Sequence, residues 1–191
     1  MRWVTASGVR HFSLHIAPNL GKRATPVSWV RTFGRKVTIM IIGIPRELLP
    51  GENRVAATPT TVPALLKLGY EVVVEAGAGE HAAQPDRAYE EAGARIVEPG
   101  EAWKADLVLA VNEPTDDQIS LMRAGAVLVT FLHPRQDLAL TEKLAAAGVT
   151  GLSMDMVPRI SRAQSMDALS SMANISGYRA VVEAAFAYGR T

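Results

Sequence analysis

The sequence predicts an α/β fold in which a parallel β-sheet carries helices on both faces. Short apolar runs of strand length recur along the chain, and helix-length segments stand between them, several followed by glycine. Continuous apolar runs of about 4–8 residues are typical of parallel strands that are buried on both faces. The regular order of strand, helix and strand also requires crossover connections, which are right-handed in such sheets.

End signals place the helices. Pro59 is tolerated in the first turn of a helix over Pro59–Leu68, and Gly69 follows the last residue of that helix. Gly93 and Gly148 end two later helices in the same manner. The predicted helices, in order, are Pro59–Leu68, Pro85–Ala92, Thr115–Met122, Leu138–Ala147 and the Ala-rich residues 167–189.

Runs of β-branched residues and leucine place the strands between these helices. Glu71–Glu75, for example, contains three consecutive valines. The arrangement predicts a Rossmann-like or flavodoxin-like parallel sheet, whose ligands bind beyond the carboxyl ends of the strands. The predicted strands, in order, are Ile41–Ile44, Glu71–Glu75, Arg95–Val97, Leu107–Val111, Ala126–Leu132 and Val149–Ser153.

Composition excludes several classes of function. The 191 residues have a net charge of +1, but residues 1–39 hold seven basic and no acidic side chains. Residues 40–191 therefore hold 13 basic and 19 acidic side chains, a net of −6, which gives no reason to expect nucleic acid as a partner. The chain has no cysteine, and no spacing of His, Asp and Glu indicates a metal site. No apolar run approaches the roughly 18 residues of a membrane span.

Three segments are expected along the chain. Residues 1–39 form a basic extension, residues 40–166 form the α/β domain, and residues 167–191 form a long helix that leads toward a further domain. The extension has the composition of a mitochondrial transit peptide. A disordered extension, or translation from a start upstream of the true one, explains the same composition, because Met40 directly precedes the first strand.

One glycine-rich segment matches a dinucleotide-binding pattern. Gly77–Ala82 fits G-x-G-x-x-A behind the strand Glu71–Glu75, and Glu98 lies about twenty positions further on. In that motif a helix opens on the glycines, so that its amides meet the pyrophosphate. Here the helical pattern begins only near Pro85, which favours a tight turn over a nucleotide site.

A polar loop near the end of the chain is a better candidate for a ligand site. Residues 157–170 carry guanidinium, amide, carboxylate and hydroxyl groups before an Ala-rich helix. Such a loop is costly to order unless its polar groups meet a ligand, and these groups suit the hydroxyls and amide of a nucleotide. As an alternative, Asp167 and Ser170 only cap the helix.

Seven motifs in order span residues 40–190. They are G-I-P-R-E at 43–47, E-N-R-V-A-A-T-P at 52–59, V-E-A-G-A-G at 74–79, Y-E-E-A-G-A at 89–94, N-E-P at 112–114, F-L-H-P at 131–134 and P-R-I-S-R-A-Q-S-M-D-A-L-S-S-M-A-N-I-S-G-Y-R-A-V at 158–181. Together they resemble the N-terminal domain of the alanine dehydrogenase and NAD(P) transhydrogenase family. Each motif alone is weak, but their number and order are specific.

Asn112 separates the two branches of this family. Alanine dehydrogenases hold and protonate their substrate with an arginine in the N-R-V motif, a lysine before E-P and a histidine after the F/Y-L pair. Arg54 and His133 match the first and third, and a structural role is the alternative for each. An amide at the lysine position cannot pair with a carboxylate as a cation or shuttle a proton. With the last motif, this favours the NAD(H)-binding component of a proton-translocating NAD(P) transhydrogenase.

That resemblance implies roles for residues of the loop. Asp167 and Ser170 are expected to hold the nicotinamide carboxamide, and Gln164 to reach toward the ribose of NADP(H) on a partner domain; these three are the expected catalytic positions. Arg159 is expected to steady the loop and the dinucleotide. Direct hydride transfer needs positioning rather than a protein acid or base. The NAD(H)-binding residues implied are Arg159, Ile160, Ser161, Gln164, Asp167 and Ser170.

The resemblance also implies a reaction and partners. The reaction is NADH + NADP⁺ to NAD⁺ + NADPH, coupled to inward proton movement through membrane subunits. The implied partners are those membrane subunits, an NADP(H)-binding subunit and a second copy of this component. The expected location is the cytoplasmic face of the plasma membrane rather than the mitochondrial matrix.

Two alternatives stay open. One is an amino-acid oxidoreductase of the alanine dehydrogenase kind, and the other is an orphaned domain without catalysis. The family's second half carries the true G-x-G-x-x-G and the helices that complete the first domain, and none of it is found in these residues. The chain alone is therefore expected to be inactive and to leave an apolar face of its long helix exposed.

Overall fold

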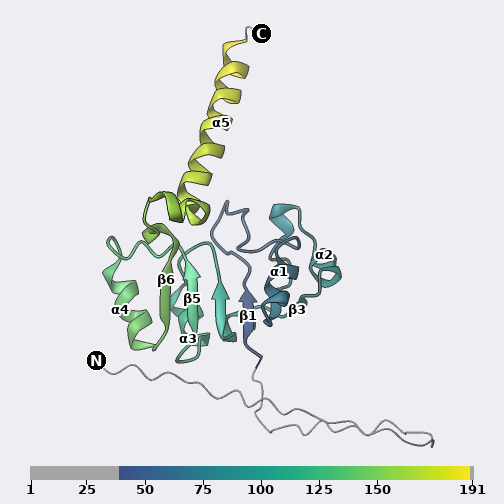
Figure 1. The fold of residues 1–191 in the computed structure, drawn as a ribbon, viewed down its shortest axis with the longest axis vertical. Coiled ribbons are helices and arrows are strands. Elements are labelled where there is room, and N and C mark those ends of the chain that lie inside the picture. Colours follow the sequence, from purple (N-terminus) through teal and green to yellow (C-terminus); the bar gives the residue numbers. More distant parts are fainter. Residues whose placement is uncertain (1–38, 190–191) are drawn as a thin grey trace, which may run out of the picture. The chain divides into compact units, whose positions relative to one another are not determined.

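Residues 39–189 are the part of the chain that the computed structural model describes. They form a six-stranded sheet of order β3-β2-β1-β4-β5-β6, in which every neighbouring pair is parallel (Figure 1). The predicted fold class is confirmed, and this strand order is Rossmann-like rather than flavodoxin-like. The predicted extension lies outside the described residues, except for Ile39. The strands are β1 (Ile41–Ile44), β2 (Glu71–Glu75), β3 (Arg95–Val97), β4 (Leu107–Leu109), β5 (Val127–Thr130) and β6 (Thr150–Ser153).

Two strands end earlier than the apolar runs predict, because backbone N–H groups beyond their ends donate hydrogen bonds to side chains instead of to a neighbouring strand. The N–H of Val111 donates to Oε1 of Glu47 at 2.6 Å, which ends β4 before the predicted residue. The N–H of Leu132 donates to the side chains of Ser153 and Asp155 beyond the end of β5. Both corrections lie at the carboxyl edge of the sheet, where polar side chains gather.

The helices cover the two faces of the sheet with separate cores. On one face, Val62 and Tyr89 pack with Ile42 and Val74. The opposite face carries a second core that includes Leu128. Each fully buried aliphatic or aromatic side chain stabilises the fold by about 1.5–3 kcal/mol, so these cores fix the sheet. The helices are α1 (Val62–Lys67), α2 (Asp86–Glu91), α3 (Asp116–Leu121), α4 (Leu138–Ala146) and α5 (Ala168–Tyr188), and the 3₁₀ turns are η1 (Glu80–Ala82), η2 (Ala102–Lys104), η3 (Met154–Met156) and η4 (Ser161–Met166).

The crossover from β3 to β4 passes directly over β1. A Cβ atom on Gly43 would lie 2.0 Å from the carbonyl oxygen of Ala102 in η2. Only glycine permits this approach, which brings Trp103 into the core at 4% exposure. The sequence pattern did not predict η2, because a single 3₁₀ turn has no hydrophobic period.

Helix α1 is shorter than predicted and begins at Val62 rather than Pro59. The preceding residues form a separate turn, in which the Thr61 hydroxyl accepts from the N–H of Thr58 and donates to its carbonyl. Pro63 rather than Pro59 occupies the first helical turn. The other helices agree with the predicted spans to within two residues at each end.

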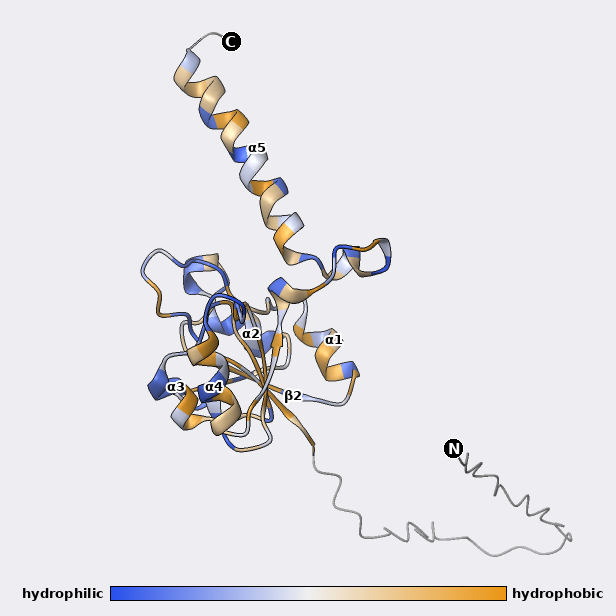
Figure 2. Cartoon of the chain, turned by 90° about the vertical axis from the view of Figure 1, so that its left-hand side faces the viewer, coloured by the Kyte–Doolittle hydropathy of each residue, from blue (hydrophilic) through white to orange (hydrophobic). Residues whose placement is uncertain are grey.

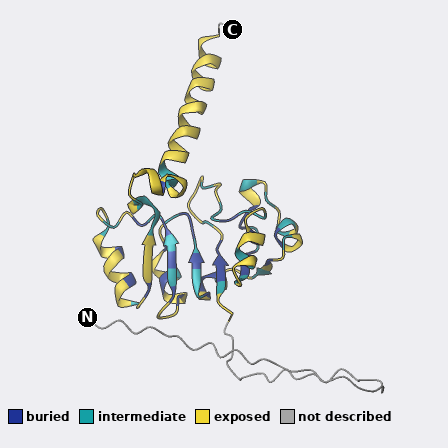
Figure 3. Ribbon diagram, viewed as in Figure 1, coloured by how far each residue is buried: buried dark blue, intermediate teal, exposed yellow. Residues whose placement is uncertain are grey.

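Helix α5 has no buried residue (Figure 3). Asp167 caps its first turn, and Gly189 ends it in the left-handed conformation at φ 64°. As predicted, large apolar side chains on it are exposed, among them Tyr178 at 75% and Phe186 at 84%. Hydrophobic positions recur along the length of α5 (Figure 2). Within residues 39–189, none of the helices combines the length and apolar character needed to cross a membrane.

Candidate functional site

The polar loop folds into a small hollow before α5. This hollow has a volume of about 260 Å³. Its lining consists of the six side chains that were predicted to contact the nucleotide, namely Arg159, Ile160, Ser161, Gln164, Asp167 and Ser170. The structure therefore brings together a guanidinium, an amide, a carboxylate and two hydroxyls in one place.

Local contacts shape this loop. Its turn η4 is held by the buried side chain of Ala163, which is 5% exposed. The N–H of Ala163 donates to the carbonyl of Ile160, and the N–H of Asp167 donates to the carbonyl of Gln164. The Gln164 side chain stays exposed, so its amide is available to an external partner.

Asp167 is the capping residue that the alternative interpretation required. Its Oδ1 accepts from the N–H of Ser170 at 3.0 Å, and its Oδ2 accepts from the Ser170 hydroxyl at 2.5 Å. The Ser170 hydroxyl, the Ser170 N–H and the charge of Arg159 lower the pKa of Asp167. Capping leaves both side chains on the hollow, so it does not exclude a ligand role.

Asn112 lies at the carboxyl edge of the sheet between two carboxylates. Its Nδ2 donates to Oε2 of Glu47 at 2.9 Å and to Oε2 of Glu52 at 3.0 Å. Both amide hydrogens are thus used inside the protein. The sequence motifs contained Glu47 and Glu52, but nothing in their spacing indicated that Asn112 joins them.

Arg54 is fixed by an ion pair rather than left open to a ligand. Its Nε donates to Oε1 of Glu52 at 2.8 Å, and its Nη2 also contacts that carboxylate. The hydrogen bond from Arg54 lowers the pKa of Glu52 to about 2, and the same pair raises the pKa of Arg54. The remaining Nη1 donates to Sδ of Met172 in α5 at 3.1 Å.

His133 belongs to a different hollow. It adopts a left-handed backbone conformation at φ 43°, and its Nδ1 lies 3.0 Å from Oε1 of Glu113. Asp155 accepts from the backbone N–H of His133. Burial raises the pKa of Asp155, but hydrogen bonds from the Ser153 hydroxyl and from the backbone N–H groups of His133 and Leu132 outweigh burial and lower the pKa. His133 lines a hollow of about 420 Å³ that does not include Arg54. The structure therefore does not bring these two residues, expected from the resemblance as a candidate ligand pocket, into one hollow.

The glycine-rich segment forms the predicted tight turn. The N–H of Gly77 donates to the carboxylate of Asp86 at 2.9 Å, which occupies an amide that a pyrophosphate would need. A Cβ atom on Gly79 would lie 2.5 Å from the carbonyl oxygen of Gln84. The glycines serve close packing around η1 rather than a helix N-terminus.

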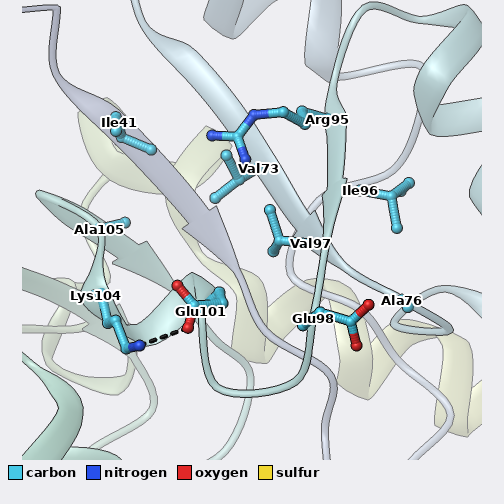
Figure 4. A pocket seen from close by; sticks show the side chains of 10 residues that line it. All are labelled: Ile41, Val73, Ala76, Arg95, Ile96, Val97, Glu98, Glu101, Lys104 and Ala105. Atoms are coloured by element: carbon cyan, nitrogen blue, oxygen red, sulfur yellow. Dashed lines mark hydrogen bonds and ion pairs between the residues drawn. The ribbon is translucent and has the colours of Figure 1, made fainter.

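A hollow of about 470 Å³ lies beside strand β3 (Figure 4). Its two cationic side chains are both paired, Lys104 with Glu101 and Arg95 with Glu71. This leaves no strong anion site there. Among the described residues, no group of three His, Asp or Glu side chains could hold a metal ion.

Comparisons with known proteins identify relatives of this chain. Residues 43–176 match the family model for the alanine dehydrogenase/PNT N-terminal domain. The NAD(P) transhydrogenase subunit alpha of Haemophilus influenzae is 56% identical over 150 residues, which are 78% of this chain and 29% of the relative. The alanine dehydrogenase of Bacillus subtilis is 38% identical over 139 residues, 72% of this chain and 36% of the relative.

A solved transhydrogenase structure is also similar to this chain. The transhydrogenase from Sinorhizobium meliloti superimposes with a TM-score of 0.75 and 45% identity, covering 78% of this chain and 45% of that one. The chain spans less than half the length of each of these three proteins. The family match covers the sheet, the loop and the start of α5, and the chain belongs to the family of alanine dehydrogenase/PNT N-terminal domains.

Proposed function

We propose that this chain is the N-terminal domain of the NAD(H)-binding component of a proton-translocating NAD(P) transhydrogenase. The observation that carries the proposal is the loop hollow, which is lined by the six predicted nucleotide-contacting residues. The identity of 56% to a transhydrogenase alpha subunit, against 38% to an alanine dehydrogenase, supports the same branch of the family.

The groups on the hollow fit the nicotinamide end of NAD(H). A carboxamide has one acceptor and two donor hydrogens. Asp167 supplies a carboxylate whose lowered pKa keeps it ionised, and Ser170 supplies a hydroxyl next to it. Bound NAD(H) would supply the hydride, while these residues fix the orientation of the ring and Arg159 steadies the loop.

Gln164 is the proposed bridge to the second nucleotide. Its side chain is exposed on the hollow, so its amide can reach a ribose hydroxyl of NADP(H) held by a partner domain. Transfer of a hydride needs the two reacting carbons in contact, and correct positioning supplies most of the rate enhancement. The proposed partners are the NADP(H)-binding and membrane subunits and a second copy of this component, at the cytoplasmic face of the plasma membrane.

Asn112 weighs against the reaction of alanine dehydrogenases. Two glutamate side chains flank Asn112, and its amide is already engaged with both of them. Arg54, which matches the substrate arginine of those enzymes, is paired with Glu52. A carboxylate substrate at Asn112 would therefore meet two glutamate side chains, and Arg54, the matching cation, is already paired with one of them.

A chimera tests the proposal. Residues 40–191 replace the matching part of the Haemophilus influenzae alpha subunit, and hydride transfer from NADH to an NADP⁺ analogue is measured with the complementing subunits. Gln164→Asn is expected to lower kcat at least about tenfold, or ~1.4 kcal/mol of transition-state stabilisation, with little change in NADH affinity. Gln136→Asn, an exposed amide outside the hollow, is the control. A wild-type rate in the Gln164 variant would contradict the bridging role, and reduction of pyruvate with ammonia would indicate an alanine dehydrogenase instead.

A further inference from the structure

The first turns of α5 meet the sheet at its carboxyl edge. Ala168 and Met172 line an apolar hollow of about 400 Å³ together with Val55, Val129 and Met154. Residues 168 and 172 are four apart, so they lie on one face of the helix. No residue of α5 is buried. The position of α5 on the sheet therefore depends on the few contacts that its first turns make.

One of these contacts joins α5 to the network around Asn112. Arg54 Nη1 donates to Sδ of Met172 at 3.1 Å across 118 positions of sequence. The guanidinium is held from behind by Glu52, and Asn112 holds both Glu52 and Glu47. Glu47 in turn accepts from the N–H of Val111, two residues beyond the end of β4. The chain of contacts thus runs from the core strand to the helix without interruption.

We propose that Arg54 is a positioning residue, which docks the first turns of α5 on the carboxyl edge of the sheet and thereby sets the place of the nucleotide loop. Asp167 and Ser170 belong to the cap and first turn of α5, so they move with Met172. The planar guanidinium reaches Glu52 and Met172 at once, because its donors point in fixed and different directions. A lysine ammonium has no such fork.

This inference rests on the proposed function only where it concerns NAD(H); the docking itself is independent of any ligand. Hydrogen–deuterium exchange of residues 159–172 in the 191-residue chain measures the docking directly. Arg54→Gln is expected to raise exchange there by about fivefold, a change typical of one lost local contact. Arg54→Lys and Met172→Leu are expected to give smaller increases, because the first keeps the charge and the second keeps the apolar contacts.

Arg95→Gln is the matched control. Arg95 also donates through Nε and Nη2 to a glutamate, Glu71, but it lies on β3 away from α5. Its loss is expected to leave exchange at residues 159–172 unchanged. Equal exchange in the Arg54→Gln and Arg95→Gln chains would overturn the docking role.

Kinetics of the chimera separate positioning from simple stability. Arg54→Lys is expected to lower kcat of hydride transfer several-fold more than it changes KM for NADH, because the loop binds but presents the ring in the wrong place. Higher exchange with wild-type kcat and KM would overturn the positioning role. Higher exchange in a chimera whose wild-type form transfers no hydride would support the docking and overturn the proposed function.

Discussion

Apolar side chains are buried around the sheet but exposed on helix α5. Tyr89 of α2, which packs on the sheet, is fully buried, and its hydroxyl donates to the carbonyl of Ala57. On α5, Phe186 is 84% exposed. The sheet is therefore specified by long-range packing within the chain, whereas α5 is specified by its own local signals.

Those local signals are sufficient to define where α5 begins and ends. Asp167 caps the first turn and Gly189 closes the last. Between them, Arg179 pairs with Glu183, which lies one turn after it in the helix. Pairs of this kind and caps contribute from a few tenths to about 1 kcal/mol each. They order a helix but give no reason for it to lie against the sheet, so the contacts of its first turns decide that question.

The largest expected effect comes from filling the closest approach in the sheet. Gly43→Ala places a Cβ atom 2.0 Å from the carbonyl oxygen of Ala102, which is backbone and cannot rotate away. We expect a loss of at least about 3 kcal/mol in the free energy of unfolding, because β1 and η2 must separate. Urea unfolding followed by circular dichroism measures this loss. A variant as stable as the wild type would show that η2 does not lie on β1.

The matching glycine in α5 is expected to respond with the opposite sign. Gly177 has nothing within 4 Å of the position that a Cβ atom would take. Gly177→Ala is therefore expected to stabilise the helix locally by about 1 kcal/mol, because alanine loses less backbone entropy. Amide exchange along α5 should slow, while the urea midpoint of the sheet stays unchanged. A shift of that midpoint would show that α5 unfolds together with the sheet.

The two regions also differ in how far the sequence predicts them. Apolar runs such as Glu71–Glu75 predicted strands correctly, because burial on both faces leaves a strong pattern. The gathering of the loop residues followed from a contiguous motif. The contact of Arg54 with Met172 could not be predicted, since it joins residues 118 positions apart and leaves no periodic signal.

The smallest expected effect concerns the junction between the regions. The pKa of Glu52 is lowered from 4.5 to about 2 by its hydrogen bond from Arg54. A lowered pKa in the folded state means that this carboxylate stabilises the fold above pH 4.5, and that the contribution is lost as the pH falls toward 2. Because the Arg54 side chain is 43% exposed, screening reduces the contribution to about 0.5 kcal/mol.

Thermal unfolding between pH 6 and pH 2 tests this contribution. Glu52→Gln is expected to flatten the dependence on pH in that range. In the wild type, the protection of residues 159–172, which is their exchange corrected for the intrinsic rate at each pH, is expected to fall with acid before the sheet unfolds. Glu71→Gln, which removes the matching partner of Arg95 on β3, is the control. This variant is expected to leave the protection of residues 159–172 as in the wild type. An identical pH profile in the Glu52 variant and the wild type would contradict the assigned ion pair.

A helix that meets its support through its first turns converts small rotations into large displacements. The 21 residues of α5 extend about 31 Å at 1.5 Å per residue. From Met172 to Tyr188 the arm is about 24 Å, so a tilt of about 10° at Met172 would carry the far end through about 4 Å. The distance between two spin labels, one on the sheet and one near Ala187, would therefore change measurably when α5 tilts at the Arg54 contact. The same tilt would change distances at the contact itself much less. In this molecule the end of α5 amplifies what happens at its base.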